Sequence, residues 1–177
     1  MPLLWLFLLV LAIAARAFVL ARARVMAQAG QDRRTLHSLP IYYGSNAAMK
    51  SAIPALLVLV VWLIAQPFYV NTVVSGMIPD DAIAESSSRG LVLAEVRRAA
   101  DGLDLAIATG NMTEDEARNT GADVADVTER LSTAGAIITS ELTQPILRAA
   151  QQFRVLNSTG YQIMTIVVLL IAIAGGA

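Results

Sequence analysis

The sequence predicts an all-α membrane protein with three transmembrane helices and an extramembrane α-helical hairpin between the second and the third. Three apolar runs predict the spans, at residues 3–19, 53–74 and 161–177, each close to the roughly 17–25 residues that cross a bilayer. The two polar connections carry opposite charge, which predicts the orientation of the spans. With 56% hydrophobic and 15% charged residues, the chain is far more apolar than a typical soluble domain.

Residues 1–21 are predicted to form the first transmembrane helix, with the amino terminus outside. No basic residue precedes the apolar run, and the positive charges follow it. That order is typical of a membrane anchor rather than a cleaved secretory signal. Arg16 falls near the inner end of the run, where its side chain can extend to the headgroups.

The connection over residues 22–50 is basic, with Asp32 as its one acidic residue. Loops rich in lysine and arginine stay in the cytoplasm, so we expect this connection to be cytoplasmic. Its cations are Arg22, Arg24, Arg33, Arg34 and Lys50.

The second span is predicted over residues 51–76. Pro54 is tolerated in its first turn, because the missing amide donor has no helical partner there. Pro67 is expected to kink or end the helix.

Residues 77–160 are predicted to form a periplasmic helical hairpin. This stretch holds 13 of the chain's 14 acidic residues, and long segments of this kind cross the membrane largely regardless of their charge. Gly110 and Asn111 predict the end of a first helix. Thr113 and Glu116 predict a capping box that starts a second, returning helix. The expected apolar stripes are Val92, Val96, Ala99, Leu103 and Ile107, then Val124, Val127, Leu131, Ala134 and Ile138.

Pro145 is expected to interrupt the returning helix or to begin a new one. A further stripe of Ile146, Ala150, Phe153 and Leu156 leads into the third span, residues 161–177. No basic residue follows this span, and we therefore expect the chain to be a fragment or to continue on another polypeptide.

The composition argues against several kinds of chemistry. The chain has no cysteine and one histidine, which leaves few ligands for a metal. It has no phosphate-binding loop of the Walker type, and the acids at 114–116 fit the start of a helix, where the dipole favours negative charge. We expect no enzymatic activity, no cofactor and no nucleic-acid partner.

The most specific local pattern lies just before the second span. It can form a basic elbow at the membrane surface that directs this span, and a ligand site is the alternative. His37 would need a neighbouring carboxylate to act as a proton switch, and Asp32 is the one acid in the connection. The residues of the pattern are Arg34, Leu36, His37, Ser38, Leu39, Pro40, Tyr43 and Gly44.

Together with Ile53-Pro54-Ala55-Leu56-Leu57 and Trp62, this pattern resembles the amino-terminal region of proteobacterial PstC-type phosphate ABC transporter permeases. The resemblance covers roughly residues 1–70. It implies a multi-pass protein of the bacterial inner membrane, in a complex with permease, ATPase and periplasmic binding-protein subunits. It also implies a permease core downstream of residue 177, so no transport residue is assigned here.

The preferred function is therefore an accessory, non-catalytic membrane module of a phosphate importer permease, in contact with the lipid bilayer and with transporter subunits. One alternative is a sensor input module with a periplasmic helical domain. Another is a stand-alone structural membrane protein that forms a homo-oligomer through the 124–138 stripe and binds anionic lipid through the elbow.

Overall fold

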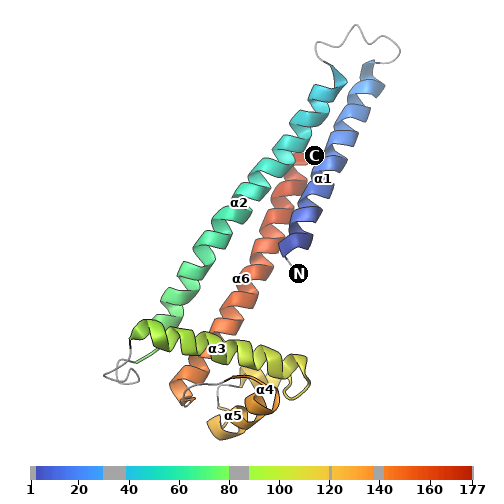
Figure 1. Ribbon diagram of the computed structural model, residues 1–177. Helices are drawn as coiled ribbons and strands as arrows, with labels where there is room; N and C mark the ends of the chain where they lie inside the picture. The colour runs from blue at the N-terminus through green and yellow to red at the C-terminus, as the bar shows by residue number, and fades with distance from the viewer. Residues whose placement is uncertain (1–2, 30–38, 80–87, 120, 138–141, 177) are drawn as a thin grey trace. The chain divides into compact units, whose positions relative to one another are not determined.

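The computed structural model describes residues 3–29, 39–79, 88–119, 121–137 and 142–176, and within these ranges all regular elements are α-helices (Figure 1). Three of the helices are long and apolar enough to cross a membrane, which confirms the predicted fold class. The helices are α1 (Leu3–Ala29), α2 (Pro40–Gly76), α3 (Arg89–Ala108), α4 (Glu114–Arg118), α5 (Val124–Thr133) and α6 (Gln144–Gly176).

The chain divides into two compact units. Unit 1 comprises Met1–Ala65 and Tyr161–Ala177, and unit 2 comprises Gln66–Gly160. Helices α2 and α6 each contribute one part to unit 1 and another part to unit 2.

In unit 1, α1, α2 and α6 pack through stripes of small and medium side chains that repeat about every fourth residue. Residues i and i+4 lie on the same face of a helix, so each stripe forms a ridge that fits between the turns of a neighbour. The buried residues of this core are Leu6 and Val10 of α1, Ala55 and Leu59 of α2, and Met164, Val168 and Ala172 of α6.

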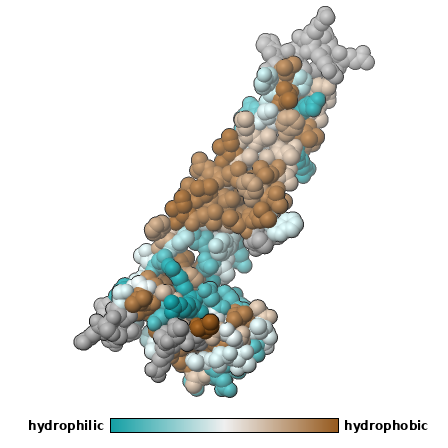
Figure 2. All heavy atoms as spheres, in the orientation of Figure 1, coloured by the Kyte–Doolittle hydropathy of each residue, from teal (hydrophilic) through white to brown (hydrophobic). Residues whose placement is uncertain are grey.

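The outer surface of unit 1 is apolar as well. Figure 2 shows hydrophobic side chains gathered over α1, α2 and α6. Leu57, Ile64 and Leu170 are each about 60% exposed. A surface of this kind is unfavourable in water and favourable in hydrocarbon, where helices satisfy their own backbone polar groups. The exposed side chains therefore suit a lipid environment.

Helix extends further than the apolar runs. Residues 22–29 continue α1, and residues 40–50 form the first turns of α2, so both ends of the predicted basic connection are helical. Pro54 consequently lies inside α2 rather than in its first turn. The helix also continues past Pro67 to Gly76, so Pro67 does not end it. A membrane helix tolerates a proline where other groups can satisfy the carbonyl that loses its partner.

Unit 2 has its own hydrophobic core, built largely on α3. Val92, Val96, Ala99 and Leu103 are buried, and Ile107 packs against them, so the predicted α3 stripe is confirmed. Helix α3 packs against α4 and α5. The core is completed by Val70 and Val74 of α2, Val127 and Leu131 of α5, and Ile146, Leu147, Ala149 and Ala150 of α6.

The end of α3 follows the predicted signals. Gly110 has φ 76°, a left-handed conformation that glycine adopts without steric cost. The amide of Asn111 donates to the carbonyl of Ala106 at 2.9 Å, and the amide of Gly110 donates to that of Ile107 at 3.0 Å, which is the Schellman arrangement. Thr113 and Glu116 then form a reciprocal capping box at the start of α4.

The prediction of a single returning helix after Thr113 is wrong. The short helix α4 ends at Arg118, and helix begins again at Val124 as α5. The Asn119 side chain accepts from the amide of Gly121 at 3.1 Å, and the Asp123 side chain accepts from that of Ala125 at 3.1 Å. Short polar side chains that bond to nearby amides compete with helix in this way. Ile138, the last residue of the expected stripe, lies outside the described residues.

Helix α6 begins at Gln144 and places Pro145 in its first turn, where a proline leaves no helical acceptor unpaired. Of the two alternatives for Pro145, a new helix is the one observed. The stripe of Ile146 and Ala150 is buried, and Phe153 and Leu156 pack against the same core. The helix then continues without a break to Gly176, as expected of a segment that leads into a span.

Candidate functional site

The pattern before the second span lies at the start of α2. Leu39 precedes the helix and accepts a hydrogen bond from the amide of Tyr42 at 2.9 Å, and Pro40 is the first helical residue. Tyr43 and Gly44 lie in the first two turns. Arg34, Leu36, His37 and Ser38 fall outside the described residues, so their predicted role stays a prediction.

Gly44 lies where α2 passes very close to α1. A Cβ atom at this position would lie 2.8 Å from the ring of Phe18 and 2.9 Å from the Phe18 carbonyl oxygen. Real Cβ atoms do not make contacts this short, so any larger residue at position 44 requires one helix to move. The glycine of the pattern thus sets the distance between the two helices.

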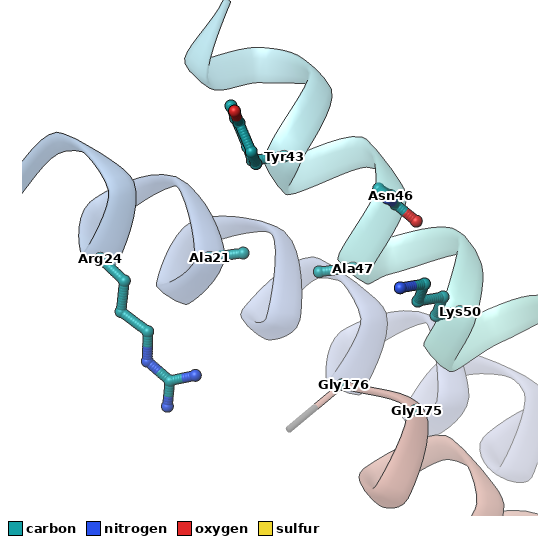
Figure 3. Close-up of a pocket in the computed structure, with 8 residues that line it drawn as sticks. All are labelled: Ala21, Arg24, Tyr43, Asn46, Ala47, Lys50, Gly175 and Gly176. Atoms are coloured by element: carbon teal, nitrogen blue, oxygen red, sulfur yellow. The ribbon is translucent and has the colours of Figure 1, made fainter. Parts of the chain in front are cut away.

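Beyond Gly44, a pocket of about 210 Å³ opens between the ends of the unit 1 helices. Figure 3 shows Ala21 and Ala47 facing the gap between α1 and α2, and the Lys50 side chain turned back toward Ala47. Arg24 extends away from Ala21 on the α1 side. The pocket is lined by Ala21, Arg24, Tyr43, Asn46, Ala47, Lys50, Gly175 and Gly176.

The floor of the pocket is made by a very close approach of α6 to α2. The buried Ser51 hydroxyl donates to the Ala172 carbonyl at 2.6 Å, and a Cβ atom on Gly175 would overlap the Lys50 carbonyl oxygen. Pro54 explains why this carbonyl is available. Four residues after Lys50, it has no amide hydrogen to donate, and its ring pushes the carbonyl off the helical line.

The acidic residues of α4 stabilise the structure of unit 2. The Glu116 carboxylate accepts from the backbone amide and from the hydroxyl of Thr113, both at 2.8 Å. These bonds, with the charge of Arg130, hold the pKa of Glu116 below its usual value. Within the described ranges, no group of three or more His, Cys, Asp or Glu side chains could hold a metal ion.

A second ionic cluster joins α6 to α3 and α4. Arg154, whose side chain is only 10% exposed, contacts Asp104 at 2.7 Å and Glu114 at 3.1 Å. Burial by itself raises the pKa of Glu114, but hydrogen bonds and charge from Arg154 and Arg118 outweigh it, so the pKa lies below its usual value. These ionisable groups form ion pairs that hold α3, α4 and α6 together.

The pattern found in the sequence includes Tyr43 of the pocket and the neighbouring Gly44, but it does not include the other residues of the pocket. Ala21, Ala47, Gly175 and Gly176 carry no chemical group that attracts notice. Their signal is small size at helical spacing, which favours close helix packing in membranes. Lys50 was assigned to the basic connection, and only the position of α6 shows that it borders a pocket.

The chain matches a known protein family. The family described as phosphate ATP-binding cassette transporter matches residues 7–177, which includes all of α2 to α6 and most of α1. No curated protein and no solved structure matches the chain.

Replacing Gly44 with alanine is expected to destabilise unit 1. The added methyl group must displace Phe18, at a cost of about 1–3 kcal/mol, which exceeds the gain of up to about 1 kcal/mol from better helix propensity. The matched control is Gly76→Ala in the same helix, where no atom lies within 4 Å of the added methyl. Thermal unfolding of both variants in detergent checks this. Equal midpoints for the two would contradict the close approach.

Acidification is expected to destabilise unit 2. Because the folded pKa values of Glu114 and Glu116 lie below 4.5, the stability they contribute is full above the unfolded pKa and is lost as pH falls through the folded values. Unfolding midpoints measured from neutral pH to below 4.5 should therefore fall.

Arg154→Gln should remove part of this pH dependence and lower stability near neutral pH by about 1–2 kcal/mol, between the values for exposed and buried pairs. Arg148→Gln on the exposed side of α6 is the control and should leave the pH profile unchanged. An unaltered profile in Arg154→Gln would show that the cluster contributes little.

Proposed function

Because the chain belongs to the phosphate ATP-binding cassette transporter family, we propose that it is an accessory membrane module of the permease in a PstC-type phosphate importer. The match over residues 7–177 carries this proposal, since it includes both the membrane helices and the helical domain between them. The resemblance of roughly residues 1–70 to PstC-type permeases supports the finer assignment.

The module is proposed to position or regulate the transporter rather than to catalyse a reaction. Three ion pairs that the structure describes in unit 2 link helices to one another. Arg154 of α6 pairs with Asp104 and Glu114, and Arg130 of α5 pairs with Glu116 of α4. Such pairs favour a fixed arrangement of helices. A domain of this kind is suited to contact with another subunit, and its partners are proposed to be the permease, ATPase and binding-protein subunits.

The proposed orientation in the bacterial inner membrane follows the charges. Arg24 of α1 and Lys50 of α2 border the same pocket in unit 1, so the basic ends of both helices lie together, as expected of a cytoplasmic end. The acidic residues of α3, α4 and α5 belong to unit 2, which is proposed to face the periplasm.

Thiol labelling is expected to confirm this orientation. The chain has no cysteine, so a single introduced thiol reports one position without background. In intact cells without an outer-membrane barrier, an impermeant maleimide should label Asp101→Cys directly and Arg22→Cys only after lysis. Both residues are exposed. The reverse pattern would overturn the orientation and the roles that depend on it.

Affinity purification from native membranes is expected to recover phosphate-importer subunits with the tagged chain. Arg154→Gln should weaken recovery if unit 2 makes the contact, whereas Arg148→Gln should not. Recovery of a signalling kinase instead would favour a sensor input module. Recovery of the chain alone, with self-crosslinks through residues 124–138, would favour a stand-alone protein.

A further inference from the structure

The pocket in unit 1 has the charge of an anion site. Arg24 and Lys50 contribute two cations to its lining, and none of the eight lining residues is acidic. Among the residues that the structure describes, the Lys50 side chain makes no hydrogen bond or ion pair, and it is exposed. Its ammonium group is therefore the cation of the pocket that can attract an anion.

The walls of the pocket do not depend on a ligand. Gly44 against Phe18 holds α2 close to α1, and a Cβ on Gly176 would lie 3.0 Å from that of Ala17. The bond from Ser51 to Ala172 holds α6 against α2. Because these contacts lie in backbone and short side chains, the hollow between Ala21 and Ala47 cannot close by simple rotamer changes.

The pocket lies where the unit 1 helices change from apolar to polar sequence. On α1 the apolar run ends at Val19, just before Ala21 and Arg24. On α2, Lys50 is the last charged residue before the apolar run that begins at Ile53. Positions at this boundary of a span lie at the level of the lipid headgroups, where tyrosine and lysine are typical.

We propose that this pocket binds the phosphate group of an anionic phospholipid, with Lys50 supplying the main charge. A phosphate offers the oxyanion that an ammonium group attracts, and basic pockets between membrane helices bind lipid headgroups. The volume of about 210 Å³ is below the roughly 300–1,000 Å³ typical of sites for drug-sized ligands, which suits one headgroup. Inorganic phosphate shares this chemistry and is the other source tested. The proposal does not require the transporter role.

The test uses the full chain in bilayers of phosphatidylcholine with spin-labelled phosphatidylglycerol. The wild type should prefer phosphatidylglycerol, and Lys50→Gln should reduce that preference about fivefold more than the control variant does, the loss expected for one charged contact worth about 1 kcal/mol. The matched control is Arg22→Gln, which removes the same charge at the same end of α1 but does not line the pocket. Equal losses in both variants would show general surface attraction and overturn the site.

A second variant tests the cavity without changing its charge. Ala47→Leu fills the space between α1 and α2 and should abolish the preference, while circular dichroism confirms that the helices persist. An unchanged preference would overturn the pocket as the binding site. In neutral detergent without anionic lipid, stabilisation by inorganic phosphate that Lys50→Gln loses would support the oxyanion site. If the wild type also showed no preference for phosphatidylglycerol, this stabilisation would show that the site binds inorganic phosphate and would reject the lipid as the source of the phosphate group.

Discussion

The arrangement of unit 1 depends on how closely α6 can approach α1 and α2. Hydrocarbon offers no hydrophobic gain when two apolar helices associate, so packing and hydrogen bonding must hold them together. Gly175 lies against the Lys50 carbonyl, and Ser51 bonds to the Ala172 carbonyl within the same contact. Larger side chains at these places would hold the helices apart. The pocket exists because the helices approach here and leave a hollow where the facing residues are alanines.

Unit 2 follows different rules because its core resembles that of a water-soluble domain. Valine, leucine and alanine side chains of α3 and α5 are buried together, which the hydrophobic effect favours. Arg154 adds ion pairs to α3 and α4 that are only partly exposed. Helices α2 and α6 each contribute to both units. Each of them therefore has one stretch suited to lipid and another stretch that packs into a core like that of a water-soluble domain.

The two proposals give the ionisable groups different tasks. In unit 2, the arginine and carboxylate side chains of the Arg154 cluster neutralise one another and leave little net charge to attract a ligand. In unit 1, cations line a pocket in which none of the described lining residues is acidic. Under the two proposals, unit 2 makes the contacts with other proteins and unit 1 binds the lipid headgroup.

The sequence by itself determined the features that depend on neighbours along the chain. The three long helices, the apolar stripe of α3, the stop at Gly110 and the capping box of Thr113 and Glu116 all arise from periodicity or from contacts within a few residues. The break between α4 and α5 is also local, since Asn119 and Asp123 accept hydrogen bonds from nearby amides. The prediction missed it because one helix was expected to run from the capping box at Thr113 through the stripe that begins at Val124.

Only the tertiary structure decided which distant residues meet. The contact of Gly44 with Phe18, the pairing of Arg154 with Asp104 and the pocket shared by Ala21, Lys50 and Gly176 join positions far apart in the chain. The small residues among them, Gly44, Ala21 and Gly176, have no periodic or chemical signature that identifies the residue they will contact. Their role follows from helix packing, because it is the distance between two backbones that requires them.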